Sequence, residues 1–250
     1  MKKEFFNILF LVVVAAVVTW LYWEGNNARK AENYILALSW QPAFCEARPN
    51  KPECRSQRKG RFDAQNFSLH GLWPQPRDNV YCGVPSNIIK TDKKGLWNKL
   101  PKLDLTKSLR DKLSKHMPGY RSNLHRHEWY KHGTCMRGGV SAEKYFQVSL
   151  QIMDRINKSP VRNLFAQSIG KEITAQQIIK TFESLFGKGF GKWIAISCKR
   201  DGKRTIINEL KISFVLPKND FVLSTEDLRD QAPKLPIGCK RGIVDPVGLQ

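Results

Sequence analysis

Hydrophobic and polar residues alternate along two N-terminal stretches of the chain, which predicts two β-strands. The first stretch, residues 33–41, carries a large apolar side chain at every second position. The second covers residues 67–72, and strict alternation there would put Ser68 and His70 on the same face. Between the two strands, residues 45–60 are rich in Pro, Lys and Arg, so we expect a loop.

The middle of the chain changes to a helical period. Leucine or methionine recurs at every fourth position of residues 105–117, just before a proline, which predicts a helix that ends there. Residues 141–156 and 174–186 each gather apolar side chains into one stripe, with Ser141 and Thr174 placed to cap the two helices.

Two further β-rich stretches lie toward the C-terminus, at residues 193–199 and 205–216. The Asp201-Gly202 step between them favours a tight hairpin turn. Strands at both ends, helices clustered between them and no regular β-α-β alternation predict an α+β fold with a central, largely antiparallel sheet. The sequence shows no internal repeat and no linker to a second domain.

An uncharged apolar segment near the N-terminus, residues 8–23, predicts that the protein is exported. Lys2 and Lys3 precede it and should stay cytoplasmic, so the chain after residue 27 is delivered outside. Two interpretations of residues 1–27 remain: a cleaved signal peptide, or an uncleaved anchor that attaches the protein to the membrane through residues 5–23.

Residues 28–250 then form one exported domain, periplasmic or extracellular, and this domain carries the charge of the chain. The 250 residues contain 42 Lys and Arg against 22 Asp and Glu, a net charge of +20, while the charges within residues 1–27 cancel. A strongly basic surface attracts polyanions such as RNA or anionic membranes, although many exported proteins are basic for solubility alone. With 41% hydrophobic residues, the sequence excludes a wholly disordered or collagen-like chain.

Six cysteines follow the export segment, and an even number in an oxidising compartment predicts three disulfides. Spacing alone leaves the pairing open, and no C-x-x-C pair points to a zinc or redox site. The six positions are Cys45, Cys54, Cys82, Cys135, Cys198 and Cys239.

The candidate chemistry lies in two short segments, residues 70–74 and 127–135, which hold three of the five histidines. On a helix that turns about 100° per residue, four polar side chains of the second segment share one arc, with Trp129 and Tyr130 left to pack into the core. These four side chains are His127, Glu128, Lys131 and His132.

A zinc site fits this segment poorly. Metalloprotease helices place two histidines four residues apart on one face, whereas His127 and His132 are five apart and diverge by about 140°. The ammonium group of Lys131 would also lie between them, next to the dication. We therefore expect neither a metal ion nor another cofactor.

The same side chains suit cleavage of RNA. This reaction needs a base for the ribose 2′-hydroxyl, an acid for the departing 5′-oxygen and cations for the phosphorane. Since histidine titrates near neutral pH, His70 and His132 facing each other can supply base and acid. Lys131 and His127 can contact phosphate oxygens, and Glu128 can orient an imidazole or keep it protonated.

The other histidines and tryptophans have simpler interpretations. Trp73 either stacks on a base or packs beside the neighbouring Gly and Pro. We interpret His116 and His125 as structural. We expect three other tryptophans, Trp40, Trp97 and Trp193, to lie in the core.

Both segments together resemble the ribonuclease T2 family. Residues 67–74, FSLHGLWP, resemble its first active-site motif, and residues 127–133, HEWYKHG, resemble the second, in the family's order along the chain. Residues 34–41 resemble its first strand, and the similarity extends from about residue 33 to residue 239.

The resemblance implies an α+β fold and a metal-independent endoribonuclease. This enzyme would cleave single-stranded RNA through 2′,3′-cyclic phosphates to 3′-phosphates, with little base specificity. His132 would be the base of the first step and His70 the acid, with the roles exchanged in the second step. His127, Glu128 and Lys131 would stabilise the transition state, and Trp73 would line a base pocket.

The family pattern also implies the disulfides Cys82–Cys135 and Cys198–Cys239, which leaves Cys45 with Cys54. Gln75 stands where many eukaryotic relatives carry an acidic residue, so base preference stays open. The alternative hypothesis is a non-catalytic, cationic exported protein that binds RNA or other polyanions. A binding protein needs charge but not paired titrating groups, so we favour the enzyme and expect a monomer.

Overall fold

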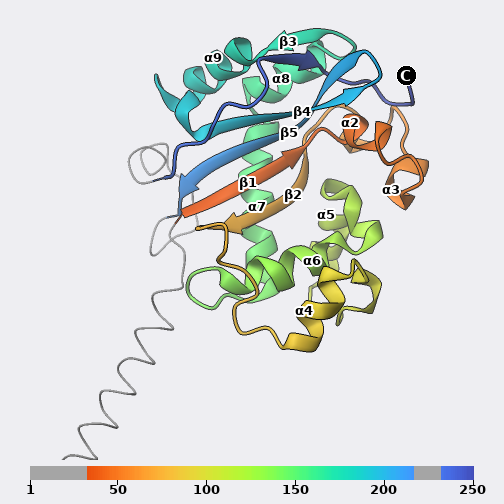
Figure 1. Cartoon of the computed structure of the whole chain (residues 1–250), viewed down its shortest axis with the longest axis vertical. Helices are drawn as coiled ribbons and strands as arrows, with labels where there is room; N and C mark the ends of the chain where they lie inside the picture. The colour runs from red at the N-terminus through yellow and green to blue at the C-terminus, as the bar shows by residue number, and fades with distance from the viewer. Residues whose placement is uncertain (1–32, 217–231) are drawn as a thin grey trace, which may run out of the picture.

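The computed structural model describes residues 33–216 and 232–250, and these form an α+β fold built on one sheet (Figure 1). The predicted fold class is confirmed, since four of the five pairings between named strands of the described residues are antiparallel. The strands are β1 (Asn33–Ser39), β2 (Ser68–Pro74), β3 (Glu172–Thr174), β4 (Ile194–Asp201), β5 (Arg204–Val215) and β6 (Arg241–Ile243). The helices are α2 (Gln41–Glu46), α3 (Pro52–Arg55), α4 (Ser86–Lys93), α5 (Lys107–His116), α6 (Leu124–Lys131), α7 (Ala142–Asn157), α8 (Pro160–Gln167) and α9 (Ala175–Phe186).

The strand order in the sheet is β2-β1-β5-β6-β3, and β4 pairs with β5. Only β5 and β6 run parallel among the named strand pairs of the described residues, through Ile206 and Ile243. The hairpin between β4 and β5 turns at Gly202, whose φ of 55° lies in the left-handed region that glycine tolerates. The predicted Asp-Gly turn is therefore confirmed.

Helix α7 crosses behind the sheet and packs on β1 and β2 (Figure 1). Its predicted apolar stripe is buried, from Tyr145 to Ile156. At the end of β1, the rings of Trp40, Phe67 and Phe165 meet with centroids 4.7–5.6 Å apart, and such aromatic contacts add about 0.5–1.5 kcal/mol each beyond the area they bury. This packing fixes β1 and β2, the strands on which the candidate site is built.

The predicted helix caps are present. Ser141 and Thr174 accept hydrogen bonds from the first turns of α7 and α9, and Thr174 forms a capping box with Gln177. Thr106 caps α5 in the same way. Helix α9 ends at Phe186, the predicted boundary.

Four short helices were absent from the sequence-based prediction. Residues 45–60 are not a continuous loop, because α2 extends to Glu46 and α3 forms one helical turn. Helices α4 and α8 were also missed, since each has only eight residues, which is too few for a helical period of apolar residues to be recognised.

The three implied disulfides are confirmed as Cys45–Cys54, Cys82–Cys135 and Cys198–Cys239. Cys82–Cys135 joins the segment before α4 to the turn that follows α6. It therefore ties the end of the second histidine segment to the chain just before α4.

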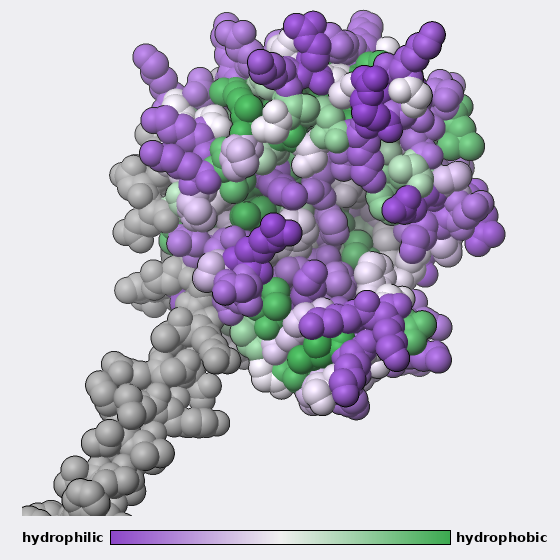
Figure 2. All heavy atoms as spheres, in the orientation of Figure 1, coloured by the Kyte–Doolittle hydropathy of each residue, from purple (hydrophilic) through white to green (hydrophobic). Residues whose placement is uncertain are grey.

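The predicted export segment, residues 1–27, lies outside the described residues. Within residues 33–216 and 232–250, no helix is long and apolar enough to cross a membrane. Hydrophilic side chains project around most of the face shown in Figure 2, with smaller apolar patches between them.

Candidate active site

A break in the pairing of β1 with β2 sets His70 apart from its neighbours. Leu38 pairs with Leu69 and Ala37 pairs with Gly71, so His70 is the extra residue of a β-bulge. Strict alternation, which grouped His70 with Ser68, therefore does not hold: Ser68 is fully buried, whereas the His70 side chain is 34% exposed. Bulges re-aim side chains in this way at many active sites.

The two ring nitrogens of His70 face different carboxylates. Nδ1 lies 2.6 Å from Oε2 of Glu209 on β5, and Nε2 lies 3.7 Å from Oε1 of Glu128 on α6. Burial acts to lower the pKa of His70, but the hydrogen bond to Glu209 and the negative charges of both carboxylates outweigh it. The pKa is raised above the ordinary value of 6.5, which favours the protonated ring.

Glu128 connects the two histidine segments. Its side chain is 1% exposed, and its Oε2 accepts a hydrogen bond of 2.9 Å from Nε1 of Trp73. The Trp73 ring lies between two imidazoles, with centroids 5.2 Å from His70 and 5.6 Å from His132. Trp73 is thus a structural neighbour of both histidines, and it also lines the adjoining pocket.

His127 is fixed by α4. Its Nδ1 lies 2.8 Å from Oδ1 of Asp92, whose Oδ2 also accepts a 2.6 Å hydrogen bond from the hydroxyl of Tyr81. Trp97 stacks on the imidazole at 4.6 Å between centroids. Nε2 of His127 lies 4.0 Å from Oε1 of Glu128, the same oxygen that faces Nε2 of His70.

His132 follows α6 directly and is 9% exposed. Its Nδ1 is buried and has no hydrogen-bond partner among the described residues. Burial, together with the positive charges of Lys131, His127 and His70, lowers the pKa of His132 to about 3. His132 is therefore neutral under conditions that leave His70 protonated.

Two pockets flank the histidines. One, of about 720 Å³, is lined by Trp73, Lys131, His132 and Lys211 among others. The other, of about 310 Å³, lies beside His70 and Glu209 and is bordered by Trp97, with Lys51 above the tryptophan ring at 5.8 Å. Two histidines with opposite protonation preferences therefore lie beside two recesses that carry lysines.

The model of the ribonuclease T2 family matches residues 31–227 of the chain. The chain belongs to the ribonuclease T2 family. Ribonuclease I of Escherichia coli (strain K12) is 28% identical to it over 239 residues, which cover 87% of each chain. Extracellular ribonuclease LE of Solanum lycopersicum is 27% identical over 152 residues, covering 60% of this chain and 61% of the relative.

Solved structures of T2 ribonucleases share the fold. The structure of RNase NT in complex with 5′-AMP aligns with a TM-score of 0.57 and 20% identity, over 88% of this chain and 98% of that one. A mutant of RNase MC1 in complex with 5′-UMP aligns with the same TM-score, 18% identity, and coverage of 86% and 98%.

The five candidate catalytic residues of this T2 ribonuclease come together from β2, α6 and the position after α6. These residues are His70, His127, Glu128, Lys131 and His132. The sequence-based interpretation missed their partners Asp92, Glu209 and Lys211, which lie on other elements.

Two expectations about aromatic residues were wrong. Trp97 is half-buried and stacks on His127 instead of lying in the core. Tyr130 is also half-buried, with its hydroxyl 3.5 Å from the carbonyl oxygen of Pro101, because the short helix α6 turns it toward the segment after α4. Trp129 does pack against the core, and Trp40 is fully buried.

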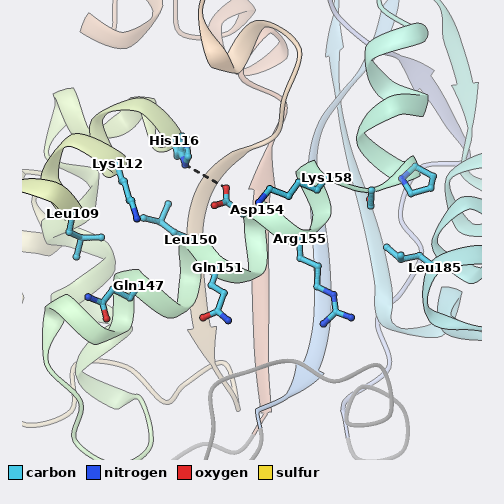
Figure 3. Close-up of a pocket in the computed structure, with 12 residues that line it drawn as sticks. Leu109, Lys112, His116, Gln147, Leu150, Gln151, Asp154, Arg155, Lys158 and Leu185 are labelled. Atoms are coloured by element: carbon cyan, nitrogen blue, oxygen red, sulfur yellow. Dashed lines mark ion pairs between the residues drawn. The ribbon is translucent and has the colours of Figure 1, made fainter.

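His116 and His125 lie away from the candidate active site. His116 stacks on Phe62 and its Nδ1 lies 3.7 Å from Asp154 in a separate pocket of about 680 Å³ between α5 and α7 (Figure 3). His125 stacks on Tyr120, and burial lowers its pKa to about 4. Both contacts agree with the structural roles expected for these histidines.

Within the described residues, no three His, Cys, Asp or Glu side chains are grouped so that they could hold a metal ion.

Proposed function

We propose that this T2 ribonuclease cleaves single-stranded RNA by acid–base catalysis between His132 and His70. The observation that carries the proposal is the opposite protonation preference of two histidines at one site: the pKa of His132 is lowered to about 3, while that of His70 is raised. A reaction that removes one proton and delivers another needs such a pair.

In the first step, neutral His132 takes the proton of the ribose 2′-hydroxyl. The 2′-oxygen attacks phosphorus, the bond from phosphorus to the 5′-oxygen breaks, and protonated His70 gives its proton to that oxygen. The products are a 2′,3′-cyclic phosphate and a free 5′-hydroxyl. In the second step the roles exchange: His70 activates water, His132 protonates the 2′-oxygen, and a 3′-phosphate remains.

Lys131 and His127 stabilise the added negative charge on the phosphorane, and Asp92 holds the His127 ring for this task. Glu128 is close to both His70 and His127, so it helps to orient both rings, and its negative charge favours the protonated form of His70. Because two histidines supply both proton transfers, the reaction requires no metal-bound hydroxide.

The positions of the two pockets support a direction for the RNA. The nucleoside that carries the attacking 2′-hydroxyl belongs on the side of His132, in the 720 Å³ pocket beside Trp73. The leaving nucleoside belongs on the side of His70, in the 310 Å³ pocket. The lysines at both pockets contact the phosphates in a sequence-independent manner, which supports low base specificity.

Residues 28–250 are proposed to form one exported catalytic domain that acts as a monomer. The five candidate residues assemble from β2, α6 and the position after α6, so the site needs no second copy of the chain to be complete. Three disulfides fit an oxidising compartment, and one relative is named an extracellular ribonuclease. Whether residues 5–23 are removed or keep the domain at the membrane is decided by N-terminal sequencing of the protein recovered from cells.

The function is tested by incubating the purified protein with single-stranded RNA in excess EDTA over a range of pH and identifying the product ends. We expect 2′,3′-cyclic phosphates that convert slowly to 3′-phosphates. Intact RNA at every pH, with folding verified, would overturn the proposal and favour a non-catalytic RNA-binding protein. Cleavage abolished by EDTA and restored by a divalent metal would indicate a metal-dependent nuclease.

A further inference from the structure

Glu209 reaches His70 from a strand that is not its neighbour. In the sheet, Ser39 of β1 pairs with Ser68 of β2 on one side and with Glu209 of β5 on the other. The Glu209 side chain therefore extends across β1 to place Oε2 2.6 Å from Nδ1 of His70. The two residues are 139 positions apart in the sequence, so only the assembled sheet brings them together.

The second oxygen of Glu209 is also engaged. Oε1 lies 3.3 Å from Nζ of Lys211, and Nζ stands 5.4 Å from the centre of the Trp73 ring. The carboxylate is 10% exposed and thus held from two sides in a partly dehydrated environment. A buried carboxylate with one oxygen on an imidazole and the other on an ammonium group is well fixed in orientation.

We propose that Glu209 is the positioning residue of His70: it accepts a hydrogen bond from Nδ1–H and so holds Nε2 toward the scissile phosphate. The inference rests on the proposed function, because it assigns the residue that prepares the acid of that reaction. With Nδ1 occupied by Glu209, the catalytic proton of His70 resides on Nε2, the nitrogen that faces Glu128 and the cleft.

The charges around His70 support this role. Glu209 and Lys211 face it from β5, Glu128 from α6 and His132 from the end of α6. Burial and the positive charge of Lys211 disfavour the protonated form of His70, whereas the negative charges of Glu209 and Glu128 favour it. Burial also acts to raise the pKa of Glu209, but its contacts with His70 and Lys211 lower it overall, so the carboxylate stays ionised. Of the two carboxylates, Glu209 is within hydrogen-bond distance of the His70 ring and Glu128 is not.

The test measures kcat and KM for RNA cleavage against pH in the full-length protein and in Glu209→Gln. The amide keeps the shape of the side chain but removes its charge. We expect the alkaline limb of the kcat profile, which reports protonated His70, to move down by about one to two pH units. At neutral pH kcat should fall by about tenfold or more, with a much smaller change in KM and recovery of the rate in acid.

Two further variants make the result specific. Lys211→Met removes the competing cation, so the alkaline limb should move up, whereas KM should rise because Lys211 lines the substrate pocket. Glu172→Gln on β3, an exposed carboxylate that pairs with Arg241 at the far edge of the sheet, should leave the profile unchanged. An unmoved alkaline limb in folded Glu209→Gln, with kcat within twofold of the unmodified protein, would overturn the proposal. If Glu209→Gln does not fold, an unmoved limb in Lys211→Met overturns it instead.

Failure of the inference and failure of the proposed function can be told apart. NMR titration of the His70 imidazole, assigned by its loss in His70→Ala, needs no substrate. We expect the pKa of His70 to be lower in Glu209→Gln than in the unmodified protein. If the unmodified protein does not cleave RNA, the proposed function fails; if the pKa of His70 is the same in both proteins, the positioning role of Glu209 fails.

Discussion

The carboxylate of Glu128 lies directly against the backbone of Gly71. A methyl group at position 71 would come within 1.9 Å of Glu128 Oε2 and within 2.6 Å of Nε1 of Trp73. Glycine therefore leaves the space that the buried carboxylate occupies, and it does so next to the bulge at His70. The hydrogen bond from Trp73 to Glu128 depends on the close approach of both side chains to Gly71.

Gly71→Ala should displace Glu128 and Trp73 together. Since a shift of about 1 Å at a catalytic group can cost a factor of 10², we expect kcat to fall by about 100-fold or more. The measurement is steady-state kinetics on RNA, with circular dichroism to verify the fold. Gly60→Ala is the matched control, because nothing lies within 4 Å of an added methyl group there. Comparable activity in the two variants would show that the position of Glu128 is unimportant.

Asp92→Asn should weaken the support of His127. Asp92 is 3% exposed and accepts hydrogen bonds from both His127 and the hydroxyl of Tyr81. A hydrogen bond to a charged group contributes roughly 1.5–3 kcal/mol, so kcat/KM should fall by about 10- to 100-fold. Asp111→Asn removes an exposed carboxylate that pairs with Lys107 on α5 and should have no effect on kcat/KM. Equal kinetics for both variants would contradict a role for Asp92.

The pH dependence of kcat/KM should be bell-shaped. His132 must be neutral to act as base, and its pKa is about 3, so activity rises through that pH and persists above it. His70 must be protonated to act as acid, and its raised pKa places the loss of activity above pH 6.5. We therefore expect the enzyme to be active on the acid side of neutral pH. A rate that keeps rising into the alkaline range would be inconsistent with a protonated His70.

The disulfides should differ in their contribution to stability. Cys82–Cys135 spans 53 residues of sequence and Cys45–Cys54 spans 9. Loop-closure entropy predicts about 4 kcal/mol for the longer link and about 2.5 kcal/mol for the shorter. Urea unfolding measures the free energy of unfolding of two variants, each with both cysteines of one disulfide replaced by alanine. A larger loss of stability in the variant without Cys45–Cys54 would contradict the estimate from chain entropy.

The predictions from sequence succeeded where a pattern is local. The helical periods of α5, α7 and α9, the capping residues of α7 and α9 and the Asp-Gly turn each depend on a few consecutive positions, and each was confirmed. The two histidine segments were also recognisable, because several reactive side chains lie close together in each.

Sequence patterns failed where the sheet or a distant element decides the result. The bulge at His70 depends on its pairing with β1, which no alternation in β2 can indicate. Glu209 and Asp92 contact their histidines across 139 and 35 positions, and each is an ordinary acidic residue in its own segment. Trp97 was expected in the core because tryptophan is large and apolar, and the sequence does not indicate that its ring stacks on His127.

The most direct test of the account separates the base from the acid. It compares His70→Ala and His132→Ala on RNA and on a uridine 3′-phosphodiester whose aryl leaving group is much more acidic than a ribose hydroxyl. Such a leaving group departs without a proton, so His70→Ala should lose RNA cleavage by about 10³-fold or more but keep most activity on the aryl ester, within about tenfold. His132→Ala should lose activity on both substrates. The reverse pattern, or equal losses on both substrates in His70→Ala, would contradict the assignment of His132 as base and His70 as acid.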